Sequence, residues 1–128
     1  MSTYIRFQTS VHCPHTKRPL GVFRTTGVLE GEGRIEEHFR DTVSETLRWY
    51  NDNLAVPRIP CEKRRSVFWF RSDQQEIVDR MWDLVAILVE HQIEVRRLRT
   101  TDPGMIVYRD DYQVAAIPSQ RINRALRV

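Results

Sequence analysis

The sequence has little cysteine and no long apolar run. Only two of its 128 residues are cysteines, Cys13 and Cys61. Two are too few for the disulfide framework of a small secreted domain, so we expect both to remain thiols. The longest strongly apolar stretch, MWDLVAILV, is interrupted by Asp83 and is far too short to cross a bilayer. The N-terminal stretch MSTYIRFQTS lacks the apolar centre of a signal peptide, and we therefore expect a cytoplasmic location and no membrane partner.

Phosphate-binding loops and metal-binding motifs are also missing. The nearest approach to a metal site is the segment HCPH, which places His12, Cys13 and His15 close together, with Cys61 or His38 as a fourth ligand. Structural zinc sites usually take their ligands from two spaced pairs, and only one cluster is present here. We expect a polar loop at this position, and neither a metal nor another cofactor.

An enzyme is the least supported class of function. Cys13 or Cys61 would need a histidine and an orienting carboxylate or amide, an arrangement recognised by geometry rather than by sequence. Asp102, Asp110 and Asp111 would be candidates for paired acids or metal ligands. Their positions in turns are explained by the hydrogen bonds that aspartate forms with local backbone. We expect no enzymatic activity, and a small enzyme using Cys/His or Asp residues remains the weaker alternative.

The composition is that of one soluble globular domain spanning residues 1–128, with 41% apolar and 29% charged residues. The charges alternate by segment. Basic and acidic side chains number four and none in residues 1–27, three and seven in 28–55, five and one in 56–71, one and five in 72–92, and seven and four in 93–128. The balances of +4, −4, +4, −4 and +3 sum to the net charge of +3.

The two acidic segments predict helices. Between residues 34 and 54, apolar side chains recur at spacings of three and four: Ile35, Phe39, Val43, Leu47, Tyr50 and Leu54. The second helix is expected to begin at Ser72, with Gln75 completing a capping box, and to carry apolar residues as far as Val89. Its apolar arc is wider than that of the first helix, which indicates deeper burial.

The basic segments predict strands. Residues 3–11 alternate between apolar and polar side chains. In residues 65–71, alternation places Phe68 and Phe70 in the core and Trp69 on the opposite face, where it is expected to be partly exposed or covered by a partner chain. Residues 93–100 form a third strand in which Leu98 is out of phase, so we expect a bulge at Arg96–Arg97.

A hairpin about Asp110–Asp111 completes the predicted sheet. A two-residue loop there pairs Val107 with Val114 and Tyr108 with Gln113, whereas the absence of a turn glycine allows a longer loop. Residues 12–33 stay open between a strand and a short helical turn.

This order of elements predicts an α+β fold. We expect one mixed or antiparallel sheet of four to five strands, with two amphipathic helices packed on one face. Residues 119–128, which contain three arginines, are expected to be a flexible or helical basic tail. Two helices cover only one face of such a sheet, so the other face is expected to be open or covered by a second copy.

The C-terminal half resembles a group of short uncharacterised bacterial proteins. The resemblance rests on VFWFR followed by a helix, and then on VRRLRTTDPGMIVYRDDYQVAAIP, with its Asp-Pro-Gly turn and its Tyr-x-Asp-x-x-Gln-Val hairpin. It implies a bacterial-type cytoplasmic domain and carries no activity with it.

The open sheet face is the candidate binding site. Its predicted members combine aromatic rings with arginines and one amide: Tyr4, Arg6, Arg65, Trp69, Arg71, Tyr108 and Gln113. Such side chains are typical of protein interface hot spots, and we place self-association or binding to a protein partner first. The alternative is single-stranded nucleic acid, which would stack on the rings and bind the cations. A net charge of +3 is modest for that role, and no RNA-binding signature is present.

Overall fold

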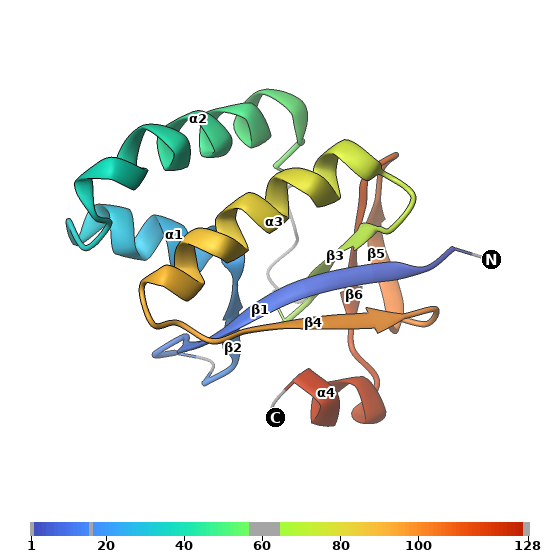
Figure 1. Cartoon of the computed structure of the whole chain (residues 1–128). Coiled ribbons are helices and arrows are strands. Elements are labelled where there is room, and N and C mark those ends of the chain that lie inside the picture. Colours follow the sequence, from blue (N-terminus) through green and yellow to red (C-terminus); the bar gives the residue numbers. More distant parts are fainter. Residues whose placement is uncertain (1, 16, 57–64, 127–128) are drawn as a thin grey trace.

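The longest strand of the sheet, β1 (Tyr4–His12), pairs with three other strands. The computed structural model describes residues 2–15, 17–56 and 65–126. In chain order the remaining elements are β2 (Pro19–Gly21), α1 (Val22–Gly31), α2 (Glu37–Asn53), β3 (Val67–Arg71), α3 (Gln75–Glu90), β4 (Val95–Thr100), β5 (Met105–Arg109), β6 (Gln113–Ile117) and α4 (Gln120–Leu126) (Figure 1). The six strands form one antiparallel sheet of order β2-β1-β3-β6-β5, with β4 paired to β1. The predicted α+β class is confirmed, with one more strand than the upper prediction.

The two edges of β1 serve different partners. Backbone groups of successive residues in an antiparallel strand point to opposite edges. The Ser10 amide donates to Glu94, just before β4, while the Thr3 carbonyl accepts from Ser72 and the Cys13 amide donates to Arg18. Even-numbered residues of β1 therefore bond to β4, and odd-numbered residues bond to β3 at one end and β2 at the other. Strands β2, β4 and β5 each pair with one other strand and lie at edges of the sheet.

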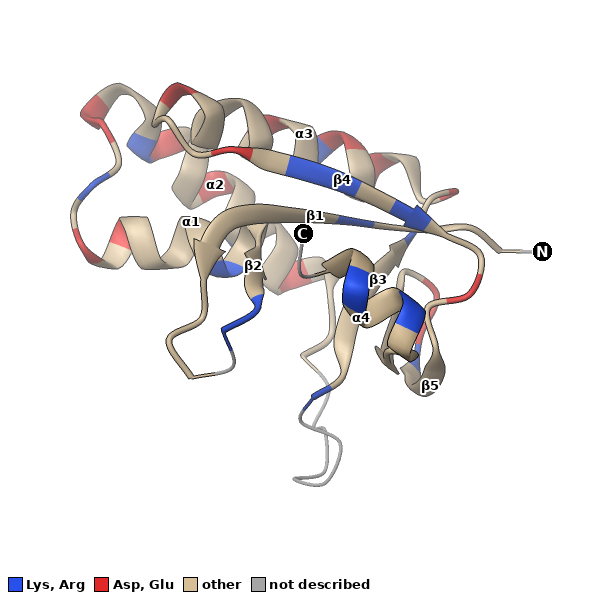
Figure 2. Cartoon of the chain, turned by 90° about the horizontal axis from the view of Figure 1, so that it is seen from below, with Lys and Arg blue, Asp and Glu red and all other residues tan. Residues whose placement is uncertain are grey.

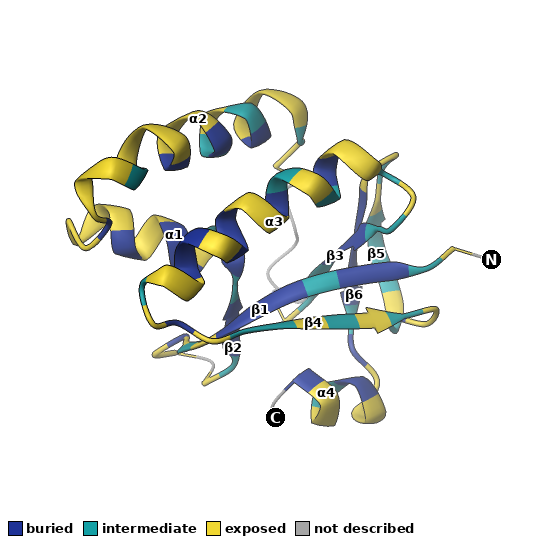
Figure 3. Ribbon diagram, viewed as in Figure 1, coloured by how far each residue is buried: buried dark blue, intermediate teal, exposed yellow. Residues whose placement is uncertain are grey.

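Helices α1, α2 and α3 cover one face of the sheet, and the short helix α4 lies on the other (Figures 1 and 3). The larger core includes Ile5, Phe7 and Phe70 from the strands together with Met81 and Leu88 from α3. The three-helix layer thus has one more helix than predicted. Among the described residues, no helix combines the length and apolarity needed to cross a membrane.

The segment left open by sequence analysis forms the third helix of this layer. In α1, Val22, Thr25, Thr26 and Leu29 are buried, at the spacing of one helical face. Buried hydroxyls need hydrogen-bond partners. Thr25 Oγ1 lies 2.7 Å from Thr9 Oγ1 on β1, and Thr26 Oγ1 donates to the Val22 carbonyl. The helix is hard to recognise from sequence because half of this buried face is threonine.

The two predicted helices are confirmed, with a correction at the start of the second. Helix α3 begins at Gln75 after an N-cap at Gln74, and no side chain caps it, so the predicted capping box at Ser72 is wrong. The Ser72 amide instead donates to the Thr3 carbonyl at the start of β1. Helices α2 and α3 are joined where Tyr50 Oη donates to the Ile77 carbonyl. Burial raises the pKa of this phenol above its ordinary value.

Two strand predictions are also corrected. The register of β4 with β1 runs without a shift from Val95 to Thr100, so there is no bulge at Arg96–Arg97. The sheet has a core on each face: the larger core beneath α1, α2 and α3, which we call the helix-side core, and a smaller core beneath α4. Leu98 packs in the smaller core and Val95 packs against the helix-side core, so both residues are accommodated on opposite faces without a bulge. In the hairpin, Tyr108 pairs with Ala115 and not with Gln113. The turn is therefore shifted along the chain relative to the predicted two-residue loop at Asp110–Asp111.

Leu88 of α3 tests the assignment of the helix-side core. Its side chain is fully buried, and an aspartate there would be an unpaired charge in an apolar site. We expect Leu88→Asp to abolish folding and Leu88→Ala to lower the free energy of unfolding by about 2–5 kcal/mol. Ala86→Asp, at an exposed position of the same helix, should lower it by less than about 1 kcal/mol. Urea unfolding followed by circular dichroism measures all three, and equal effects at residues 86 and 88 would contradict the assigned face.

Candidate functional site

Helix α4 covers much of the sheet face that the sequence nominated for binding. Ile122 and Leu126 of α4 pack against Tyr4, Trp69 and their neighbours on the sheet. Trp69 is only 2% exposed and Tyr4 only 7%. The side chains of Trp69 and Phe70 do lie on opposite faces of the sheet, as predicted. The expectation that Trp69 is partly exposed or covered by a partner chain is wrong, because the cover belongs to the same chain (Figure 3).

Side-chain hydrogen bonds hold the C-terminal end of α4 on the sheet. Gln8 Nε2 donates to the Leu126 carbonyl over 2.8 Å, and the Arg96 guanidinium donates to the Ala125 carbonyl. The last carbonyls of a helix have no partner within the helix, so these contacts act as a C-cap. The expected basic tail is thus helical over residues 120–126, with Arg121 and Arg124 exposed.

Tyr108 and Gln113 lie on the opposite face from Trp69, contrary to the prediction. Gln113 pairs with Phe70 across the sheet. Ala115 pairs with Phe68 on one side and with Tyr108 on the other, so these three residues are in register. Directly opposed residues share a face of an antiparallel sheet. Gln113 is buried and donates to the carbonyl of Ala55 beyond α2. Phe68 is only half-buried and belongs to neither core cluster, so its predicted core role is not supported, whereas Phe70 is core.

Arg6 lies where β3 and β2, which share one edge of β1, diverge, and we call this point the fork. Pairing between β1 and β3 ends at Ile5 and Phe70, so the Phe68 carbonyl, next in that register, finds no strand partner on β1. Arg6 Nη1 donates to this carbonyl over 3.2 Å, and Arg6 Nε donates to Gln8 Oε1. Burial, together with the nearby Arg18, lowers the pKa of Arg6 to about 10, which leaves it charged at neutral pH. Arg6 therefore has a structural role.

The other two predicted arginines are held near the ends of β3. Arg71 Nη2 lies 3.0 Å from Asp73 Oδ2 in an ion pair at the end of the strand. Arg65 precedes the strand, is exposed, and accepts a hydrogen bond from Arg18 through its backbone carbonyl. The seven nominated residues thus do not form one exposed surface, and a binding role for any of them stays a prediction.

Charge is segregated between elements, as the sequence pattern indicates (Figure 2). Helices α2 and α3 carry eight acidic residues and three arginines. Strand β4 and helix α4 carry five arginines and no acidic residue: Arg96, Arg97, Arg99, Arg121 and Arg124. The helices α2 and α3 are therefore acidic, whereas arginines are concentrated on the edge strand β4 and on α4.

The two most exposed large apolar side chains of the described helices lie on α3. Trp82 is 46% exposed and Val89 54% exposed. They are seven residues apart, and exposed Ala86 lies between them, so the three form one stripe along the helix. The Trp82 ring packs edge-on against Phe7 of β1, with 4.8 Å between ring centroids. The ring is thus fixed on one side and open on the other. The predicted wide apolar arc exists, but part of it faces solvent.

Strand β4 lies beside this stripe at the edge of the sheet (Figure 1). Arg97 pairs with Phe7 and Arg99 with Ile5, and both partners belong to the helix-side core. Val95, Arg97 and Arg99 therefore share the face covered by α3. Because the Ser10–Glu94 pair is hydrogen-bonded, alternation along the ladder points the backbone groups of these three residues away from β1. No described residue pairs with that outer edge. We call Trp82, Ala86, Val89, Val95, Arg97 and Arg99 the α3–β4 edge.

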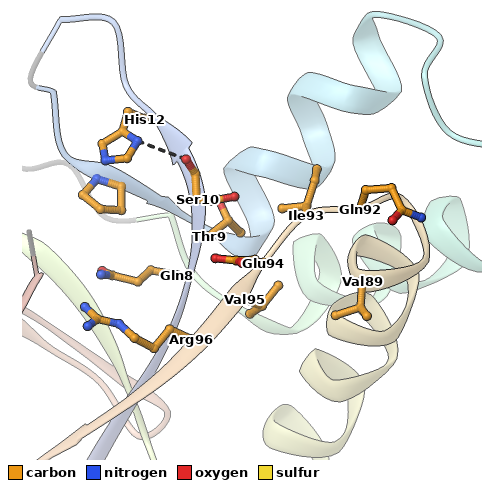
Figure 4. A pocket seen from close by; sticks show the side chains of 11 residues that line it. Gln8, Thr9, Ser10, His12, Val89, Gln92, Ile93, Glu94, Val95 and Arg96 are labelled. Carbon is orange, nitrogen blue, oxygen red and sulfur yellow. Dashed lines mark hydrogen bonds between the residues drawn. The ribbon is translucent and has the colours of Figure 1, made fainter. Parts of the chain in front are cut away.

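An open cleft of about 830 Å³ lies at the beginning of β4 (Figure 4). Gln8 and Arg96 line it from the α4 face of the sheet, whereas Val89 lines it from α3. Its side chains come from opposite faces and do not converge on one point. A small-molecule site requires convergent polar groups, so the cleft is better described as the end of the α3–β4 edge.

The histidines and cysteines do not assemble around a common point in the described residues, where no group of three His, Cys, Asp or Glu side chains is placed to hold a metal ion. His12 is exposed and its Nδ1 lies 3.0 Å from the Ser10 carbonyl, whereas Cys13 is buried. Cys61, the other proposed partner, lies outside the described residues.

The cover formed by α4 can be tested through Trp69. In a chain with Trp49→Phe and Trp82→Phe, Trp69 is the sole tryptophan, and we expect blue-shifted emission that acrylamide quenches poorly. Ile122→Asp places a charge under α4 and should release the helix, which shifts the emission to the red while the circular dichroism of the sheet persists. Arg121→Asp, at the exposed neighbouring position, should change neither. Unaltered Trp69 emission in Ile122→Asp would contradict the contact.

The turn after β5 gives a test by pH. Burial raises the pKa of Asp110, but hydrogen bonds from Tyr108 Oη, the Tyr112 amide and Gln113 outweigh it and hold that pKa below its ordinary value. A lowered folded-state pKa stabilises the fold above the unfolded-state pKa, and this stability is lost as pH falls through the folded-state value.

We expect Asp110→Asn to lower the free energy of unfolding at neutral pH by about 1 kcal/mol, since the site is partly exposed. This difference from the parent should shrink as the pH falls through the carboxylate range. Asp111→Asn, at the exposed next residue, should have little effect at any pH. Urea unfolding across this range measures both variants, and a loss in Asp110→Asn that is independent of pH would show that Asp110 is not the titrating group.

No family model, curated protein or solved structure matches the chain. The resemblance of its C-terminal half to short bacterial proteins therefore stays a prediction, and the candidate site rests on geometry.

Proposed function

We propose that the protein is a small cytoplasmic interaction module that binds a polypeptide partner along the α3–β4 edge. The observation that carries the proposal is the half-exposed Trp82, aligned with Val89 beside an edge strand. Tryptophan and arginine are enriched among the residues that dominate protein interfaces. This is the function first suggested by the sequence, transferred from the α4 face of the sheet to its edge.

Trp82 has the properties of an interface anchor. Its contact with Phe7 restricts the ring before any partner binds, so little conformational entropy is lost on binding. Removing the exposed part of the ring and of Val89 from water would be favourable, and exposed apolar side chains that cluster in this way mark interaction sites. Arg97 and Arg99 supply a polar rim on the same face, as interfaces require.

A second copy of the chain is a weaker candidate for this partner. Antiparallel pairing of β4 with β4 of another copy, centred on Arg97, would place Arg97 opposite its own equivalent, with Arg99 two residues away. Like charges that face each other across strands are destabilising, and charged edge strands discourage such pairing. Self-association is nonetheless distinguished directly by sedimentation of the purified chain over a range of concentrations.

Single-stranded nucleic acid is the second candidate function, favoured by the five arginines and absent acidic residues of β4 and α4. Stacking platforms are less well provided. Tyr4 and Trp69 are buried, and the α3–β4 edge contains one aromatic ring, that of Trp82. A steep dependence of oligonucleotide affinity on salt, lost on neutralising the arginines, would favour this function.

Peptide selection tests the proposed function without knowledge of the partner. A displayed library of random linear peptides is selected on the wild-type chain, and the dissociation constants of enriched peptides are measured for variants. We expect Trp82→Ser to weaken binding by about 30-fold or more, as loss of an interface anchor does. Tyr112→Ser, which removes another exposed aromatic ring outside the α3–β4 edge, should change it less than about twofold. Enriched peptides that bind Trp82→Ser as tightly as wild type would refute the proposed site.

A further inference from the structure

We infer that the partner segment is an extended, acidic strand that adds to the outer edge of β4. The inference deepens the proposed function and rests on it. The inference is based on two properties of β4 that are independent of the exposure of Trp82. These are the direction of the backbone N–H and C=O groups of β4 and the positive charge of its side chains.

The backbone of β4 is prepared for a further strand. Val95, Arg97 and Arg99 each direct one N–H and one C=O away from β1, as the pairing of Ser10 with Glu94 fixes. The side chains of these same three residues lie on the α3 face. A strand hydrogen-bonded to them would place every second side chain beside Trp82 and Val89, the alternation by which peptides bind sheet edges.

The charges of β4 select the sign of the partner. Arg97 and Arg99 are exposed on this face, and β4 carries no acidic residue. Acidic side chains placed opposite them would form cross-strand ion pairs, which stabilise a sheet, whereas basic ones would repel. At the other end of the edge the neighbours are Val89 and Val95, so an apolar side chain fits best there.

The order of these positions gives a sequence pattern. The whole sheet is antiparallel, and antiparallel pairing is slightly more stable than parallel pairing. An antiparallel partner meets Arg99 first, Arg97 next and Val95 last. Its pattern is therefore acidic-x-acidic-x-apolar, with the x side chains directed to the α4 side of the sheet.

A defined peptide tests this pattern. The probe is a labelled peptide containing Thr-Glu-Thr-Glu-Thr-Leu-Thr, and its dissociation constant is measured by fluorescence anisotropy. Replacing both glutamates by glutamine should weaken binding by roughly 5- to 10-fold, the effect of two exposed ion pairs. The variant Arg97→Gln/Arg99→Gln should weaken binding of the glutamate peptide equally and remove its advantage over the glutamine peptide. Arg121→Gln/Arg124→Gln, on exposed positions of α4, should leave the advantage intact.

Backbone methylation tests whether the peptide binds as a strand. N-methyl groups on the glutamates and leucine block the edge that faces β4, and should weaken binding by more than about tenfold, because several hydrogen bonds are lost. The same modification of the threonines, whose amides point away, should have little effect. Equal effects of the two modifications would overturn strand addition.

The remaining outcomes separate this inference from the proposed function. If the glutamine peptide binds as well as the glutamate peptide and both require Trp82, the edge binds polypeptides but the acidic partner is wrong. If the probe does not bind while selected peptides of another pattern do, the inferred pattern fails and the proposed function stands. If a short oligothymidylate binds through Arg97 and Arg99 more tightly than the probe, the edge is an anion site for nucleic acid and the acidic strand is overturned.

Discussion

The arrangement of the sheet depends on how β1 divides its hydrogen bonds between two edges. One edge is used entirely by β4, and the other is shared by β3 and β2, which separate at Phe68. A carbonyl left unpaired at such a fork would be costly to bury. Arg6 supplies the missing donor from β1 itself, and its guanidinium also donates to the Gln8 side-chain oxygen.

Strand β1 also connects the two cores of the molecule. Ile5 and Phe7 contribute to the core beneath α1, α2 and α3, whereas Tyr4 packs in the smaller core beneath α4. Gln8 belongs to the second side and holds the end of α4. Both faces of the strand are thus covered by its own chain. The outer edge of β4 and the adjoining stripe of α3 have no such cover among the described residues, which is why we place the interaction there.

The proposed interaction uses the features that distinguish this edge from the rest of the surface. Trp82 packs against Phe7 and is half-exposed. The outer N–H and C=O groups of β4 point away from β1 at every second residue, and Arg97 and Arg99 give the edge a positive charge. Each property acts on a different part of a partner: its apolar side chains, its backbone and its charged side chains. Together they favour an extended polypeptide over a folded surface or a small molecule.

The sequence by itself determined the elements whose pattern is local. The helix periodicity of residues 35–54, the alternation about Trp69 and the segregation of charge are all present in the structure, because each depends only on neighbours along the chain. Helix α1 was not recognisable, since its buried threonines require Thr9 of β1 and local carbonyls to satisfy them. The position of Leu98, out of phase with the other apolar residues of β4, is likewise explained only when both faces of the sheet are covered by apolar cores.

The candidate site was decided by tertiary structure. Alternation showed that Trp69 and Phe70 face opposite ways, but not that α4 would fold back over Trp69 and bury it. Conversely, Trp82 belongs to the apolar pattern of α3 and looks like core in the sequence. It is exposed because β4 is the last strand on its side, so the layer beneath α3 ends there. Which side chains remain in contact with water depends on where a sheet ends, and this is fixed by pairing between distant segments rather than by any local pattern.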